Sequence, residues 1–136
     1  MAAVSAAAQF KASADQAWAK VGSFEETSWI PGNDGSEVSG EGVGATRSFK
    51  TPDGGQIVER LEAHDAAGRS YTYSIVEAPM PIQNYQSTIA VKPAGDGSEV
   101  SWSCTFEVAP DLEETIVGAL KGLYEGAMAG LKESLG

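Results

Sequence analysis

The sequence predicts an α+β fold in which one long C-terminal helix lies across a curved antiparallel sheet. Three observations indicate it. Short segments alternate apolar and polar residues, as half-buried strands do. Six of them follow one another between residues 36 and 108, and the turns between them leave no room for crossover helices, so neighbouring strands must pair antiparallel. Residues 110–135 then carry apolar side chains at helical spacing.

The N-terminal elements are a strand and two short helices. Residues 4–10 alternate with a period of two and predict the first strand. Ser13 and Gln16 have the spacing of a capping box, which starts a helix that Gly22 ends. A second helical turn is expected within residues 23–35, before its Pro and Gly residues form a loop.

The six strands in series are separated by turn-forming sequences at 39–42, 53–55, 67–68, 79–81 and 95–97. The last strand shows the clearest alternation, with Trp102 and Cys104 in its apolar row. In the final helix, one broad arc holds Leu112, Ile116, Leu120, Leu123, Tyr124, Ala127, Met128, Leu131 and Leu135. This arc is expected to cover the sheet, giving a β-α-α-β6-α order in a single domain of residues 1–136.

A glycine occurs every fourth residue in the final helix, at Gly118, Gly122, Gly126 and Gly130. Glycine inside a helix costs about 0.5–1 kcal/mol relative to alanine, so this stripe needs a reason. One interpretation is close packing or a tolerated surface feature. The other is that the missing side chains leave room for a ligand or for another helix.

Composition excludes several functions. The chain has 9 Lys and Arg against 19 Asp and Glu, a net charge of −10, and no basic run, so nucleic acids and anionic membranes are poor partners. One cysteine and one histidine exclude an internal disulfide and a cysteine-based zinc site, and no cofactor or metal is expected. Residues 1–10 have the features of neither a secretory signal nor a membrane span, so a cytoplasmic location is expected.

Strand alternation places polar side chains on the face that should be core. Strand 43–50 is expected to turn Val43, Ala45, Arg47 and Phe49 inward, and strand 56–64 to turn Ile57, Glu59, Leu61 and Ala63 inward, with Arg60 and His64 outward. The predicted inner wall carries Arg47, Glu59, Tyr73, Glu77 and Tyr85. Since an isolated buried charge costs several kcal/mol, either Arg47 pairs with Glu59 or a water-filled cavity solvates both. The tyrosines either line that cavity or fill the core.

No familiar catalytic arrangement is evident. His64 is expected to face solvent, and Cys104 to fill the core. The glycines at 40, 42 and 44 lack the helix that a phosphate site requires. The sequence therefore identifies no catalytic residue.

Several motifs together resemble the START-like SRPBCC superfamily, in its polyketide cyclase/dehydrase and lipid-transport branch, from about Ala6 to Leu135. They are residues 12–18 (ASADQAW) with Gly22 and Phe24, 42–47 (GVGATR), 58–61 (VERL) with His64 and Asp65, and 73–77 (YSIVE) with Pro79, Pro81, Asn84 and Tyr85. The resemblance implies the helix-grip fold: a seven-stranded antiparallel sheet wrapped around a long C-terminal helix, with a hydrophobic cavity between them.

Plant abscisic-acid receptors are more distant relatives that share the Glu-Arg-Leu and Asn-Tyr elements. This likeness implies that Glu59 and Tyr85 line a pocket and that 51–56 and 78–84 are mobile entrance loops. The receptors' gate sequence is replaced here, and their pocket lysine falls near Pro31, so hormone reception is not implied. In the related aromatase/cyclases, pocket Arg, Tyr and Trp side chains orient a polyketide; Arg47, Tyr73 and Tyr85 are candidates for that role.

The expected function is a carrier or sensor that binds a small hydrophobic or aromatic ligand in the internal cavity. The predicted ligand-binding residues are Arg47, Glu59, Tyr73, Glu77, Tyr85, Trp102, Tyr124 and Met128. The alternative is a cyclase or dehydratase in which Glu59 or Glu77 acts as general base and Arg47 or Tyr85 stabilises an enolate. A third reading is a stress or assembly protein with an incidental cavity, and homodimer formation is left open.

Overall fold

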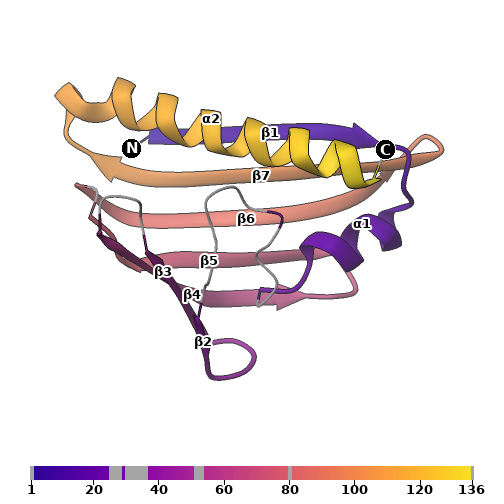
Figure 1. The fold of residues 1–136 in the computed structure, drawn as a ribbon, viewed down its shortest axis with the longest axis horizontal. Helices are drawn as coiled ribbons and strands as arrows, with labels where there is room; N and C mark the ends of the chain where they lie inside the picture. Colours follow the sequence, from indigo (N-terminus) through magenta and orange to yellow (C-terminus); the bar gives the residue numbers. More distant parts are fainter. Residues whose placement is uncertain (1, 25–28, 30–36, 51–53, 80, 136) are drawn as a thin grey trace.

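The computed structural model describes residues 2–24, 29, 37–50, 54–79 and 81–135 (Figure 1). In chain order the elements are β1 (Ala2–Phe10), α1 (Ala14–Val21), β2 (Glu37–Ser39), β3 (Thr46–Lys50), β4 (Gln56–Asp65), β5 (Ser70–Glu77), β6 (Ile82–Ala94), β7 (Gly97–Val108) and α2 (Pro110–Leu135). The strands form one seven-stranded antiparallel sheet in the order β1-β7-β6-β5-β4-β3-β2. The predicted α+β architecture is confirmed.

The first helix begins and ends as predicted. The Ser13 hydroxyl accepts a hydrogen bond from the Gln16 backbone N–H, and the Gln16 side chain accepts one from the Ser13 N–H, which completes the capping box. At the other end, a Cβ on Gly22 would lie 2.4 Å from the Trp18 ring, so only glycine fits there. The second helical turn expected within 23–35 lies largely outside the described residues, as do parts of the entrance loops expected at 51–56 and 78–84.

The long helix packs on one side of the sheet. Figure 1 shows α2 running along β1, and its buried residues include Leu120, Tyr124, Ala127 and Leu131. Neither α1 nor α2, within the part of the chain that the structure describes, has the length and hydropathy of a membrane-crossing helix.

The glycine stripe of α2 lies on the exposed side of the helix. A Cβ on Gly118, Gly122 or Gly130 would meet no atom within 4 Å. Close packing therefore does not explain these three glycines. The interpretations that remain are a tolerated surface feature and the approach of another helix.

A bulge in β4 reverses the expected orientation of His64. The register between β4 and β5 slips between Leu61 and Ala63, and beyond the slip His64 lies opposite Tyr71. The rings of His64 and the buried Tyr71 stack with centroids 6.1 Å apart. His64 is exposed, as expected, but it lies on the opposite face of the strand from Arg60 rather than on the same face, because one extra residue exchanges the two faces of a strand. Ala63, expected inward, is exposed for the same reason.

A second slip moves Glu77 off the inner wall. The register changes between Val58 and Glu59, so that Glu77 lies opposite Val58 while Glu59 lies opposite Ile75. Adjacent residues of a strand point to opposite faces, so Glu77 faces away from Glu59. Glu77 is exposed, and its predicted place on the inner wall is wrong.

Val43 was expected to point inward at the start of a strand, and this expectation is wrong. It is 64% exposed, and β3 begins only at Thr46. Gly42 and Gly44 on either side have positive φ angles of 66° and 96°, which turn the chain rather than extend it. Regular alternation therefore begins two residues later than the pattern indicated, and Ala45 is the first buried residue.

Candidate functional site

A buried ion pair lies on the inner face of the sheet, where β3 and β4 pair. Arg47 and Glu59 are directly opposite each other in the register, and Arg47 Nε donates to Glu59 Oε1 at 2.6 Å. Arg47 is 0% and Glu59 6% exposed. Of the two arrangements that the sequence allowed, a direct pair or solvation of both groups, the structure has the direct pair.

The rest of the Arg47 guanidinium is enclosed by aromatic rings. Its Cζ lies 4.3 Å from the ring centroid of Phe24 and 4.8 Å from that of Tyr73, within cation–π range. Nη1 donates to the Phe24 carbonyl oxygen at 2.7 Å. Nη2 has no hydrogen-bond partner among the described residues.

Burial and the ion pair shift the pKa of each charged group in opposite directions. Burial raises the pKa of Glu59, and the Arg47 guanidinium opposes that rise. Burial favours the neutral form of Arg47, but the Glu59 carboxylate more than offsets it, with further help from Tyr71 and Tyr73, so the pKa of Arg47 lies above its usual value. Arg47 is therefore charged at every physiological pH.

Tyrosine and phenylalanine rings continue from this pair across the inner face. Tyr71, Tyr73, Tyr85 and Phe106 succeed one another with centroids 6.2, 6.3 and 6.1 Å apart. Burial raises the pKa of Tyr71, Tyr73 and Tyr85, so these side chains keep their hydroxyl protons. The wall is apolar along its rings and presents neutral hydroxyl groups.

Hydrogen bonds join this wall to β7 and α2. Trp102 Nε1 donates to Ser87 Oγ at 2.7 Å and to the Tyr73 hydroxyl at 3.1 Å. The hydroxyls of Tyr85 and Tyr124 are 2.5 Å apart, and the ring of Tyr124 stacks on Trp102 at 4.0 Å. The sheet and helix thus bring six of the predicted site residues into one cluster: Arg47, Glu59, Tyr73, Tyr85, Trp102 and Tyr124. Met128, which was also predicted, is buried one turn after Tyr124 on α2. Glu77 is exposed and lies outside the cluster.

Three buried polar atoms have no hydrogen-bond partner among the described residues: Arg47 Nη2, the Tyr71 hydroxyl and Trp29 Nε1. All three can donate a hydrogen bond. Sequence reasoning did not identify Trp29 or Phe24, because they follow α1 in a segment without periodicity. Tyr71 has the same strand parity as Tyr73, but an unpartnered hydroxyl leaves no trace in an alternation pattern.

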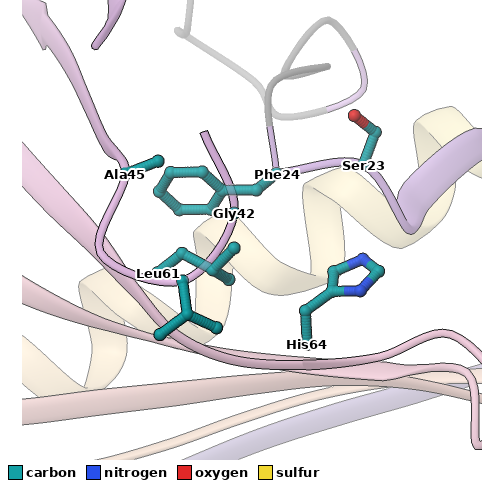
Figure 2. Close-up of a pocket in the computed structure, with 7 residues that line it drawn as sticks. Ser23, Phe24, Gly42, Ala45, Leu61 and His64 are labelled. Carbon is teal, nitrogen blue, oxygen red and sulfur yellow. The ribbon is translucent and has the colours of Figure 1, made fainter. Parts of the chain in front are cut away.

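A pocket of about 450 Å³ opens beside this cluster, at the edge formed by β4 and the residues before β3 (Figure 2). Its lining residues are Ser23, Phe24, Gly42, Val43, Ala45, Leu61 and His64. Phe24 contributes to both the pocket and the buried cluster, since its ring also covers Arg47. His64 Nε2 lies 2.9 Å from the Gly22 carbonyl oxygen, so that nitrogen carries the proton.

Glu77 lines a different pocket, of about 440 Å³, between the end of β5 and the start of β6. The internal cavity expected between the sheet and α2 stays a prediction. Among the described residues, no group of three or more His, Cys, Asp or Glu side chains is placed to hold a metal ion.

Comparison with known proteins gives one family and many similar structures. The sequence profile of the family described as "Polyketide cyclase / dehydrase and lipid transport" matches residues 1–136. No curated protein matches the chain at a significant level.

Two bacterial proteins are similar over nearly their whole length. The protein XoxI from Bacillus cereus is 33% identical, with a TM-score of 0.90 over 99% of this chain and 96% of that chain. A protein from Thermobifida fusca is 26% identical, with a TM-score of 0.92 over 100% of this chain and 94% of that chain. Norcoclaurine synthase from Thalictrum flavum, solved in complex with dopamine and hydroxybenzaldehyde, shares the fold: it is 21% identical, with a TM-score of 0.76 over 97% of this chain and 84% of that chain.

Proposed function

Because the chain belongs to the polyketide cyclase/dehydrase and lipid-transport family, we propose that it is a carrier or sensor that binds a small, largely hydrophobic molecule between the inner face of its sheet and α2. The observation that carries the proposal is the aromatic wall with buried donors that have no hydrogen-bond partner among the described residues. Buried polar groups in folded proteins are almost always hydrogen-bonded, and a ligand is one source of the missing acceptors. Norcoclaurine synthase, which has the same fold, binds small aromatic molecules, and this supports a ligand of that size.

The residues proposed to line the site fall into two groups. Arg47 and Glu59 supply the polar end, and the rings of Tyr73, Tyr85 and Trp102 supply apolar area. Tyr124 and Met128 close the wall from the helix side. Burial of apolar ligand surface contributes roughly 25 cal/mol per Å², so the rings supply affinity and the polar end fixes orientation.

Native mass spectrometry of the protein purified from its own source tests the proposal. We expect a population heavier than the chain by one bound small molecule, which denaturation releases. A protein that has only its sequence mass, and that binds no member of a panel of small aromatic and aliphatic molecules, would contradict the proposal.

A matched pair of double variants locates the bound molecule. Arg47→Met with Glu59→Gln removes the buried pair while keeping the size of both side chains, and we expect the bound population to fall. Arg60→Met with Glu62→Gln removes the exposed pair of the same sheet, whose atoms lie 2.9 Å apart, and should leave the bound population unchanged. Equal loss in both double variants would place the molecule elsewhere.

One observation favours a cyclase-like or dehydratase-like enzyme as a second candidate function. Burial raises the pKa of Glu59, which brings a carboxylate toward the range of a general base, and Arg47 beside it is a fixed positive charge for an enolate. If the bound molecule is a substrate, Glu59→Gln abolishes its conversion while binding persists. If the protein is a carrier, the molecule is recovered unchanged from both proteins.

A further inference from the structure

In the sheet that the structure describes, β1 is an edge strand and pairs with β7 on one side. A Cβ on Gly97 of β7 would lie 1.9 Å from the Phe10 carbonyl oxygen, so that oxygen points toward β7. The Gln9 carbonyl oxygen instead accepts a hydrogen bond from Lys132 Nζ of α2 at 2.5 Å. Because the backbone groups of successive residues point to alternate sides of a strand, every second residue of β1 turns its N–H and C=O away from β7. These residues are Ala3, Ser5, Ala7 and Gln9.

This edge lacks the features that usually protect a sheet from the addition of another strand. From Ala2 to Phe10 it is nine residues long and contains no proline and no charged side chain. The opposite edge, β2, is three residues long and begins with Glu37. Natural proteins usually shorten or charge their edge strands, because the free N–H and C=O groups of an edge readily pair with another chain. The β1 edge is therefore a candidate interaction surface.

The long helix leaves the middle of this edge open. α2 runs along β1, and the side chains of every second β1 residue belong to the core beneath it (Figure 1). Among these, Val4 and Phe10 are buried, but Ala6 and Ala8 between them are only half-buried. Another strand therefore has access to the edge around Ser5.

Charge favours a second copy of this chain as the partner. The chain carries a net charge of −10, so two copies repel each other wherever their carboxylates meet. The sheet beside the middle of the β1 edge is neutral instead, because Ala3, Ser5 and Ala7 lie opposite hydroxyl residues of β7. Those hydroxyl residues are Thr105, Ser103 and Ser101. Two copies can therefore meet at this edge without bringing like charges together.

The sequence of β1 is also nearly the same in both directions from Ser5. Two residues away on either side stand Ala3 and Ala7, and three residues away stand Ala2 and Ala8. In an antiparallel pair of β1 strands with a twofold axis at Ser5, the same patch of each copy meets the other, and small side chains lie opposite one another. The edge is therefore complementary to itself.

We propose that two copies of the protein form a symmetric dimer by pairing their β1 strands antiparallel around Ser5, so that one sheet continues across both copies. A single strand pair is a small interface, and we expect a weak dimer with a dissociation constant of about 10–100 µM. This dimer needs no bound ligand, so its absence would leave the proposed function standing.

Sedimentation velocity at increasing protein concentration measures the association. We expect single chains at about 1 µM and mostly dimers at about 1 mM. Amide hydrogen exchange identifies the strand, because the outward amides of Ala3, Ser5 and Ala7 should exchange about fivefold more slowly at the higher concentration. The amides of Val4 and Ala6, which face β7, should keep their rates. A chain that stays monomeric up to about 1 mM would overturn the proposal and leave the edge to a strand from another protein.

A disulfide test locates the twofold axis. In the proposed pairing the two Ser5 Cα atoms are about 5.5 Å apart, which a disulfide can span, so Ser5→Cys should form a covalent dimer under mild oxidation. The native Cys104 is buried. The matched control is Ser103→Cys, an exposed position opposite Ser5 on β7, whose counterpart in the dimer lies about 14 Å away. Equal cross-linking of the two variants would overturn the proposal.

A charge test separates this contact from general repulsion between acidic chains. Ser5→Lys and Ser103→Lys each remove one unit of net negative charge, so general repulsion alone predicts tighter association for both. In the proposed dimer, Ser5→Lys places two lysines directly opposite each other, and we expect the dissociation constant to rise about fivefold. Ser103→Lys should leave it unchanged or lower it. Equal effects of the two substitutions would overturn the proposal.

Discussion

At the scale of single residues, the buried pair of Arg47 and Glu59 is a costly feature. Two charges removed from water lose hydration worth several kcal/mol each, and a well-packed apolar pair of the same size is often as stable or more so. The direct bond at 2.6 Å and the Phe24 carbonyl satisfy only part of the guanidinium. A pair of this kind is therefore better explained by its use in a site than by its contribution to stability.

Removal of Arg47 alone should make stability strongly dependent on pH. In Arg47→Met, burial raises the pKa of Glu59 with no guanidinium to oppose it. A carboxyl whose pKa is higher in the folded than in the unfolded state, where it is about 4.3, stabilises below the unfolded value and loses this contribution as the pH rises through the folded value. We expect the variant to lose about 3–5 kcal/mol relative to wild type near pH 8 and clearly less near pH 4, measured by urea unfolding.

The double variant Arg47→Met with Glu59→Gln is the control for this pH dependence. It has no titrating group at the site, so its difference from wild type should lack the steep increase of the single variant. Arg60→Met, which breaks an exposed pair, should cost about 0–1 kcal/mol at any of these pH values. A stability difference for Arg47→Met that stays constant from about pH 4 to about pH 8 would contradict the account of the pair given above.

Most residues of the buried cluster could be predicted because their strands are regular. Arg47, Tyr73 and Trp102 lie in regular stretches of their strands, so the period of two assigns their face correctly. Tyr85 lies at the end of an irregular stretch between Gln83 and Gln86, and its alternation with the buried Ser87 and Ile89 assigns its face. The cost of buried charge left two arrangements of Arg47 and Glu59 open, a direct pair or solvation of both groups, and alternation could not decide between them. The unpartnered state of the Tyr71 hydroxyl could not be predicted, because it depends on what stands opposite one atom, and alternation gives only the direction of a side chain.

At the scale of elements, two of the errors in the sequence analysis share one cause. His64 and Glu77 both lie beyond a register slip between β4 and β5, and each slip exchanges inner and outer faces for the residues after it. A bulge inserts one residue and has no characteristic sequence. An alternation that is counted straight through the bulge therefore assigns the residues after it to the wrong face. The termini of α1, by contrast, were predictable from Ser13 and Gly22, because capping depends on local chemistry.

Replacing glycines of the α2 stripe by alanine should stabilise the protein. Gly122→Ala adds a methyl group that meets no atom within 4 Å, in the interior of a 26-residue helix. Alanine restricts the unfolded chain and favours the helix, so the substitution should stabilise the protein by about 0.5–1 kcal/mol in urea unfolding. Gly118→Ala should have the same effect.

Gly97→Ala is the opposite control, since its Cβ would lie 1.9 Å from the Phe10 carbonyl oxygen and must force the backbone apart. The molar mass in solution, measured by light scattering, completes the experiment. Loss of stability in Gly122→Ala together with loss of a dimer would mean that a second copy covers the stripe, and would contradict its interpretation as free surface.

At the scale of the whole molecule, topology was the most predictable property. Short connections between strands admit few arrangements, and a single amphipathic helix has one sheet to cover. The observed order β1-β7-β6-β5-β4-β3-β2 is a meander from β2 to β7 with β1 added beside β7. Whether a cavity lies between the sheet and α2 depends on the sum of many side-chain volumes, which no local pattern in the sequence encodes.

The excess of acidic residues should make the stability of the whole molecule depend on salt. The net charge is −10, and the four ion pairs among the described residues leave most of the described carboxylates without a cationic partner, so like charges repel across the molecule. Raising NaCl from about 0.01 M to about 0.15 M shortens the screening length from about 30 Å to about 8 Å, so repulsion across the molecule falls. We expect the thermal midpoint to rise by roughly 3–5 °C, equivalent to about 1 kcal/mol.

Two exposed positions about one turn apart on α2 separate this repulsion from other effects of salt. Glu125→Lys lowers the net negative charge by two and should raise the midpoint at low salt while reducing its increase with NaCl. Lys121→Glu changes the charge by the same amount in the other direction, so it should lower the midpoint at low salt and steepen the increase. If both variants responded to NaCl as wild type does, local contacts rather than the total charge would set the salt dependence, and the repulsion inferred from the composition would not govern the stability of the fold.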